Sequence, residues 1–100
     1  MKRIICGKKY DTDTAEKIAR WDNGLSVSDF DFCEESLHIK RTGEFFLHGE
    51  GGPNSKYAKA VDNCFTGGEK IIPLSENEAK KWVENHANEK YEQIFGEVEE

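Results

Sequence analysis

The clearest hydrophobic pattern lies in the last third of the chain. Four side chains recur there at the i, i+3, i+4 and i+7 spacing of a helix stripe, namely Ala79, Trp82, Val83 and His86. Ser75 and Glu78 have the spacing of a capping box and predict where this helix begins. The same spacing returns in Tyr91, Ile94, Phe95 and Val98 and predicts a second helical segment, weakened by Gly96.

Patterns typical of strands occupy the first three quarters of the chain. Hairpins are predicted near residues 2–10, turning at Gly7, and near residues 37–48, turning at Gly43. A strand at residues 70–74 ends at Pro73 or lies at a sheet edge, because proline has no N–H to donate. Strands first and helices last predict an α+β domain, in which C-terminal helices pack on a small antiparallel sheet.

Three other segments have weaker signals. Residues 13–21 fit a helical turn, which we favour, and a short strand nearly as well, with Asn23-Gly24 ending either one. Residues 55–60 predict one helical turn and residues 63–68 a loop. The glycine-rich stretch at residues 49–53 is interpreted as a turn leaving the hairpin, with a partner-binding loop as the alternative.

Composition limits the function. The chain has 100 residues, 36% hydrophobic and 34% charged, which suits a single domain over residues 1–100 with one modest core. Its net charge of -6 argues against direct nucleic-acid binding, which requires a basic surface. The apolar runs are too short for a membrane span and the N-terminus has no signal-peptide pattern, so we expect a cytoplasmic protein that does not bind membranes.

Candidate chemistry is sparse. Cys6, Cys33 and Cys64 form no C-x-x-C pair and are expected to be small buried hydrophobes in a reducing compartment. The histidines do not have the spacing typical of metal ligands, so neither a metal nor a cofactor is predicted. No nucleophile has a recognisable base and orienting group, so the protein is predicted not to be an enzyme. The larger aromatics are predicted to be core or partial core: Tyr10, Trp21, Phe45, Phe46, Phe65, Trp82, Tyr91 and Phe95.

An acidic segment at residues 28–35 carries more information. On a strand, the alternation there would bury Phe30 and Phe32 and project Asp29 and Asp31 outward. One interpretation is a solvated acidic edge that discourages aggregation. The other is a partner-binding surface whose carboxylates imitate backbone phosphates and occupy a basic groove. The candidate partner-binding residues are Asp29, Asp31, Glu34, Glu35 and Glu50.

Several sequence segments together resemble those of a family of short acidic proteins carried by plasmids, conjugative elements and prophages of bacteria. They are Gly7-Lys8-Lys9-Tyr10-Asp11-Thr12, Trp21-Asp22-Asn23-Gly24, Glu44-Phe45-Phe46-Leu47-His48-Gly49-Glu50-Gly51-Gly52, Ser55-Lys56-Tyr57, Gly68-Glu69-Lys70-Ile71-Ile72-Pro73-Leu74-Ser75 with Glu78-Ala79-Lys80, and Ile94-Phe95-Gly96-Glu97-Val98. The resemblance spans nearly the whole chain and carries no catalytic residues. Through genomic association, it implies an anti-defence role such as that of anti-CRISPR inhibitors.

We therefore expect an anti-CRISPR-type inhibitor. It would bind a host CRISPR effector, or another basic nucleic-acid-binding protein, through an acidic surface that mimics nucleic acid. The alternative is a small structural or accessory protein of a mobile element that acts by protein–protein interaction, including self-association through a sheet edge. Acids gathered on one face would favour the inhibitor, and acids spread evenly would favour the accessory protein.

Overall fold

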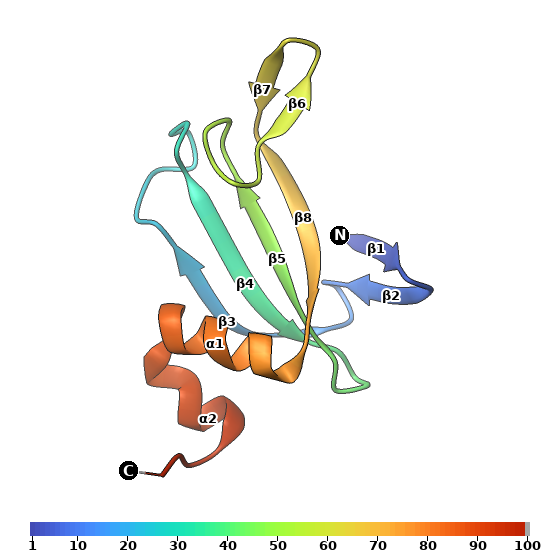
Figure 1. Ribbon diagram of the computed structural model, residues 1–100, viewed down its shortest axis with the longest axis vertical. Helices are drawn as coiled ribbons and strands as arrows, with labels where there is room; N and C mark the ends of the chain where they lie inside the picture. The colour runs from blue at the N-terminus through green and yellow to red at the C-terminus, as the bar shows by residue number, and fades with distance from the viewer. Residues whose placement is uncertain (100) are drawn as a thin grey trace.

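A computed structural model describes residues 1–99, so Glu100 of the expected domain lies outside the described residues. Its centre is a four-stranded antiparallel sheet in the order β3-β4-β5-β8 (Figure 1). These strands are β3 (Glu16–Asp22), β4 (Cys33–Ile39), β5 (Phe45–Gly51) and β8 (Gly68–Leu74). Two separate hairpins flank the sheet: β1 (Lys2–Ile5) with β2 (Lys8–Asp11), and β6 (Lys59–Val61) with β7 (Cys64–Thr66). The C-terminal part contains α1 (Glu76–His86), a 3-10 turn η1 (Asn88–Lys90) and α2 (Tyr91–Phe95).

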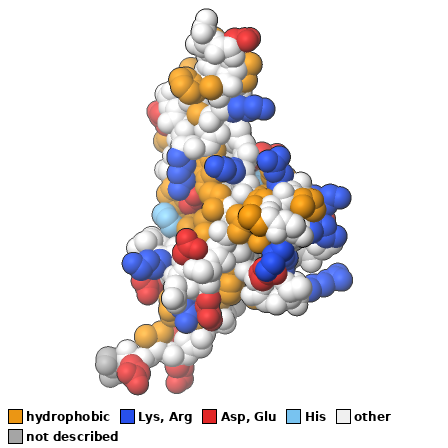
Figure 2. Space-filling view, turned by 45° about the vertical axis from the view of Figure 1, so that its right-hand side comes forward, with side chains coloured by type: hydrophobic (Ala, Val, Ile, Leu, Met, Phe, Trp, Pro, Cys, Tyr) orange, Lys and Arg blue, Asp and Glu red, His pale blue; other side chains and the backbone are white. Residues whose placement is uncertain are grey.

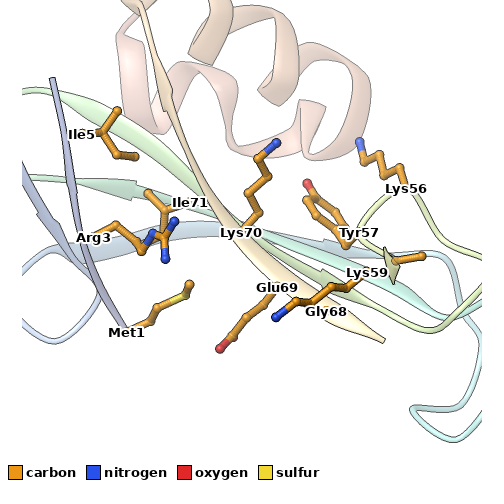
Figure 3. Close-up of a pocket in the computed structure, with 11 residues that line it drawn as sticks. Met1, Arg3, Ile5, Lys56, Tyr57, Lys59, Gly68, Glu69, Lys70 and Ile71 are labelled. Carbon is orange, nitrogen blue, oxygen red and sulfur yellow. The ribbon is translucent and has the colours of Figure 1, made fainter. Parts of the chain in front are cut away.

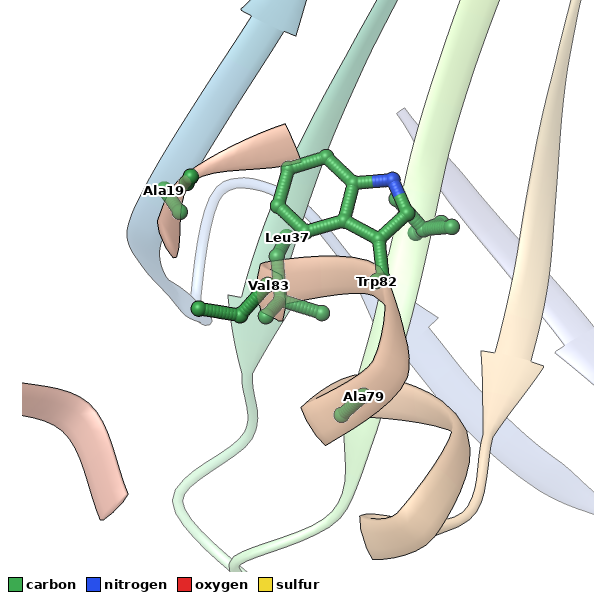
Figure 4. Packing of buried hydrophobic residues seen from close by; sticks show 7 residues of the cluster. Ala19, Leu37, Ala79, Trp82 and Val83 are labelled. Carbon is green, nitrogen blue, oxygen red and sulfur yellow. The ribbon is translucent and has the colours of Figure 1, made fainter. Parts of the chain in front are cut away.

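Helix α1 covers one face of the sheet and forms the larger core. Ala79, Trp82 and Val83 are its buried residues. They pack against three buried sheet residues, Ala19, Leu37 and Leu47 (Figure 4). Burying an apolar side chain of Val or Leu size contributes about 1.5–3 kcal/mol. Alternation along each strand directs these sheet residues to the α1 side, which we call the helix face.

The other side of the sheet, the open face, is covered at one end by the β1–β2 hairpin. Tyr10 from this hairpin meets Phe46 edge-on at 5.7 Å between ring centroids, and Ile71 completes a second buried cluster. The hairpin turns through Cys6 and Gly7, whose φ angles are +51° and +77°. Two positive φ angles match the twist of the flanking strands, which explains the tight turn.

The α+β fold class is confirmed. Both predicted hairpins exist, although the second begins earlier, at Cys33. The Ser75 side chain accepts a hydrogen bond from the Glu78 backbone N–H, and the Glu78 side chain accepts one from the Ser75 backbone N–H. The predicted capping box is therefore present. Strand β8 pairs with β5 alone among the described residues, which places Pro73 on an edge strand. The second helix ends at Gly96, whose φ is +94°, and leaves Val98 exposed.

Other local predictions were wrong. Residues 16–22 form a strand rather than the favoured helical turn, because pairing with β4 buries Ala19 beside Leu37. A β-bulge between Lys17 and Ala19 disturbs the alternation, which explains why the pattern looked helical. Residues 59–61 and 64–66 pair as a hairpin where a helical turn and a loop were expected.

Exposure on the two small hairpins also differs from expectation. Cys33 is buried as predicted, whereas Cys6 and Cys64 are exposed. Phe65 is exposed as well, because the β6–β7 hairpin extends beyond the sheet and packs on no core cluster (Figure 1). Among residues 1–99, no helix has both the length and the apolar character needed to cross a bilayer.

Candidate protein-interaction surface

Carboxylates form a row across the end of the sheet that lies away from α1. The strand register places Asp22 opposite Glu34, Glu34 opposite Glu50, and Glu50 opposite Glu69. Residues directly opposite one another share a face of the sheet, and neighbouring strands lie about 4.8 Å apart. The acidic row, defined as Asp22, Glu34, Glu50 and Glu69, therefore crosses all four strands on the open face.

Three carboxylates of this row have a basic neighbour, and Glu50 in the middle has none among residues 1–99. Arg20 binds Glu34 at 2.9 Å and Asp22 at 2.7 Å. The Gly24 backbone N–H and the Arg20 guanidinium together lower the pKa of Asp22. His48 Nε2 lies 2.9 Å from Glu69, and within residues 1–99 Glu50 has no ion pair. Glu50 lies opposite both Glu34 and Glu69, and like charges directly opposite one another on neighbouring strands are destabilising. Features that act against stability in this way are concentrated at functional sites.

A surface hollow of about 680 Å³ adjoins the acidic row. We call it the distal hollow. Three segments line it, at residues 27–30 with Phe32, at residues 50–53 and at residues 67–69. Val27 and Phe30 are 79% and 66% exposed, so the hollow combines apolar side chains with Asp29, Glu50 and Glu69. A surface of this composition fits a protein partner that offers both basic and apolar groups.

Backbone contacts between two loops build the hollow. The Gly52 N–H donates to the Phe32 carbonyl at 2.9 Å, and the Asn54 N–H donates to the Phe30 carbonyl at 2.8 Å. A Cβ at Gly52 would lie 2.5 Å from that Phe30 carbonyl oxygen, so only glycine permits this approach. The glycine-rich loop thus holds the acidic segment in place.

The structure distributes the five predicted partner-binding residues unequally. Asp29 and Glu50 line the distal hollow together. Asp31 is exposed beside them, and its N–H donates to Asp29 Oδ1 at 2.8 Å. Glu34 belongs to the acidic row and is partly neutralised by Arg20. These four residues are compatible with a role in partner binding.

Glu35 does not belong to this surface, because its side chain is only 1% exposed. It lies on the helix face, where its carboxylate accepts hydrogen bonds from Tyr57 and from Trp82 Nε1 (3.0 Å) and pairs with Lys56 Nζ (2.7 Å). Glu35 therefore fastens α1 and the loop after β5 to the sheet. Burial acts to raise the pKa of Glu35, but the donors from Lys56, Tyr57 and Trp82 outweigh it and lower the pKa.

The predicted strand alternation at residues 28–32 was also wrong. The segment forms turns, with the Asp29 N–H donating to the Ser26 carbonyl and the Phe32 N–H to the Asp29 carbonyl. Phe32 is buried as expected, whereas Phe30 is exposed. Val27, Asp22 and Glu69 were missed as candidates. Only the strand register could have identified the last two, since they lie far apart in the sequence.

One pair resembles a nucleophile with its base but is enclosed. Ser36 Oγ lies 3.2 Å from His38 Nε2, and both residues are buried. The His38 ring stacks on Phe46 at 5.0 Å, and burial, with the nearby His48 and Lys17, lowers its pKa to about 4. A substrate has no access to this pair. Among the residues described, no three potential ligand side chains gather closely enough to hold a metal ion.

Comparison of this chain with protein-family models, with curated proteins and with solved structures gave no match.

Proposed function

We propose that this protein is a non-enzymatic inhibitor that binds a basic surface of a nucleic-acid-handling protein. The acidic row carries the proposal: four carboxylates stand side by side across the sheet with incomplete compensation. Such a row attracts Lys and Arg side chains that otherwise hold phosphates, and it speeds encounter with them. Asp29 and Asp31 extend the negative charge beyond the sheet.

The distal hollow supplies the part of the interaction that salt does not screen. Val27 and Phe30 expose apolar surface next to the acids, and burying apolar area contributes about 25 cal/mol per Å². The proposed binding set is Asp22, Asp29, Asp31, Glu34, Glu50 and Glu69, with Val27 and Phe30. No cofactor is needed for inhibition by occupying a groove.

The family resemblance supplies the class of partner. From that resemblance we propose a CRISPR effector with a basic groove as the target, and the inhibitor would act in the cytoplasm beside it. Binding there would prevent guide or target nucleic acid from entering. The inhibitor itself would not contact nucleic acid.

Charge reversal within the acidic row tests the proposal. Glu50→Lys with Glu69→Lys should weaken inhibition in plasmid-interference assays with a panel of CRISPR effectors, and should weaken binding most at low salt. The fold should survive, because Glu50 and Glu69 lie opposite each other, so the double change replaces one pair of like charges with another. Glu84→Lys with Glu89→Lys makes the same charge change on exposed helical positions and should leave inhibition intact.

If the two double variants inhibit plasmid interference equally well, the acidic row has no part in the mechanism. If no effector in the panel is inhibited by the wild type, a photo-crosslinker at Phe30 should still capture a basic nucleic-acid-binding protein in bacteria. Capture of other copies of this chain would instead support the accessory-protein alternative. The exposed Val61 and Phe65 on the β6–β7 hairpin favour that second candidate.

A further inference from the structure

The central sheet has two edge strands, β3 and β8, and the outer edge of β8 is already covered. Met1 and Ile5 pack against the cluster that contains Ile71, which is only 4% exposed (Figure 3). A Cβ at Gly68 would lie 2.5 Å from the Tyr57 carbonyl oxygen, so the segment before β6 lies against the start of β8. Lys and Arg side chains also gather on this side of the molecule (Figure 2), and they would repel the same side of a second copy. A further strand therefore has no place beside β8.

The outer edge of β3 is open. Within residues 1–99, β3 pairs with β4 alone, and it lies at one side of the sheet in Figure 1. The Asn23 N–H donates to the Cys33 carbonyl at 3.1 Å, so these two residues form a hydrogen-bonded pair that continues the β3–β4 ladder. Bonding directions alternate along an antiparallel strand, so Trp21 also bonds to β4. Arg20 and Asp22 then direct their N–H and carbonyl groups away from the sheet.

No hydrogen bond within residues 1–99 occupies these outward groups. The backbone hydrogen bonds of turns and loops involve neither Arg20 nor Asp22. Their side chains are 47% and 29% exposed, and helix α1 packs on the helix face rather than along the edge. The bulge between Lys17 and Ala19 ends the regular edge on one side, and Gly24, with a φ of +80°, ends it on the other. The open edge is therefore short.

Charge determines which partner and which register fit this edge. Two copies of β3 can pair antiparallel about a two-fold axis, with outward positions opposite outward positions. Arg20 then lies opposite Arg20, Asp22 opposite Asp22, or Arg20 opposite Asp22 of the second copy. The first two registers oppose like charges, which is destabilising, whereas the third forms two attractive pairs. In the third register the Trp21 side chains of the two copies are also neighbours, and aromatic pairs across strands are favourable.

We propose that this protein forms a dimer through the outer edges of β3. Arg20 of each copy lies opposite Asp22 of the other, and the two four-stranded sheets join into one antiparallel sheet. The assembly stops at two copies, because the two-fold axis uses both β3 edges and the β8 edges are covered. The two acidic rows then lie on one face of the joined sheet. That last consequence bears on the proposed inhibition, whereas the dimer itself does not depend on it.

Charge exchange tests the pairing, with sedimentation velocity over a concentration series at low salt as the readout. Arg20→Glu and Asp22→Arg each turn both attractive pairs into repulsive ones, so each should weaken dimerisation about tenfold. An equimolar mixture of the two variants pairs opposite charges at both contacts again and should form heterodimers as tightly as the wild type forms homodimers. A contact elsewhere on the molecule would not give this rescue.

Matched controls carry the same charge changes outside β3. Lys9→Glu and Glu89→Arg lie at exposed positions, and each should dimerise within about twofold of the wild type, alone and in the mixture. Far-UV circular dichroism checks that every variant is folded. If the two β3 variants dimerise as well as these controls, or if their mixture shows no rescue, the proposed seam is wrong.

Amide hydrogen exchange in the wild type tests the backbone pairing without any substitution. The amides of Arg20 and Asp22 should exchange about tenfold more slowly at concentrations where the protein is a dimer than where it is a monomer. The amide of Trp21 bonds to β4 in either state and serves as the reference. Protection on Ala60 or Phe65 instead would place the contact on the β6–β7 hairpin and overturn the proposal, as would a protein that stays monomeric at millimolar concentration. None of these measurements involves an effector, so the dimer and the proposed inhibition can fail separately.

Discussion

Replacing Glu35 probes the buried contact that joins three parts of the fold. Its carboxylate accepts from Tyr57 and Trp82, and both donors are buried with it. Glu35→Ala leaves two buried donors without an acceptor, and each such donor costs about 1–3 kcal/mol. We therefore expect a loss of about 2–6 kcal/mol in the free energy of unfolding, which is a large share of the roughly 5–15 kcal/mol typical of a domain.

Glu35→Gln isolates the contribution of the charge. The amide oxygen can accept from Trp82 and the amide N–H can donate to the Tyr57 oxygen, so shape and hydrogen bonding are largely kept. What is lost is the charge-assisted part and the pair with Lys56, whose own side chain is mostly exposed. We expect Glu35→Gln to cost less than Glu35→Ala, about 1–3 kcal/mol at neutral pH.

The pH dependence of the free energy of unfolding shows whether the Glu35 charge stabilises the fold. The pKa of Glu35 is lower in the folded protein than its ordinary value, because donors outweigh burial. Its charge therefore stabilises the fold above the unfolded pKa of about 4.3, and this stabilisation is lost as pH falls through the lower folded pKa. Urea unfolding followed by tryptophan fluorescence at pH 7 and pH 3 measures it. A difference between wild type and Glu35→Gln that is the same at both pH values would refute the reasoning.

Three further changes test other contacts. Ser75→Ala removes the helix cap and should cost about 0.5–2 kcal/mol in urea unfolding; an unchanged midpoint would show that the cap contributes nothing. Trp82→Ala should cost about 3–5 kcal/mol, judged by thermal unfolding, and a well-folded variant that lost partner binding would instead make Trp82 an interface residue. Gly49→Ala places a Cβ where the Tyr57 ring lies and should displace that ring. Its cost in urea unfolding should shrink in a Tyr57→Ala background, and equal costs in both backgrounds would contradict that clash.

The elements predicted correctly are those whose signals are local. A capping box, a helix stripe and a glycine turn each act within a few residues, so Ser75, the α1 stripe and Gly43 could be interpreted directly. Residues 16–22 could not be, because strand pairing with β4 decides their conformation and a bulge breaks their alternation. The β6–β7 hairpin was missed because its residues are exposed and carry no burial pattern.

The candidate site, too, could be predicted only where local sequence signals decide the structure. The concentration of acids near residues 29–35 was evident from the sequence, but their exposure was not. Glu35 looks like its acidic neighbours, and only the approach of Tyr57 and Trp82 from distant parts of the chain makes it internal. The acidic row requires the register of all four strands, which no single segment encodes.

The strand order has a kinetic consequence. Pairings β3–β4 and β4–β5 join consecutive strands through residues 23–32 and 40–44, whereas β8 reaches β5 only after the longer segment 52–67 has looped out. Closing the longer loop loses more chain entropy, so the three-strand meander over residues 16–51 should form early. Helix α1 follows β8 directly and should dock with it. We therefore expect Glu35 to stay hydrated through the rate-limiting step, so its substitution should accelerate unfolding while leaving the refolding rate nearly unchanged.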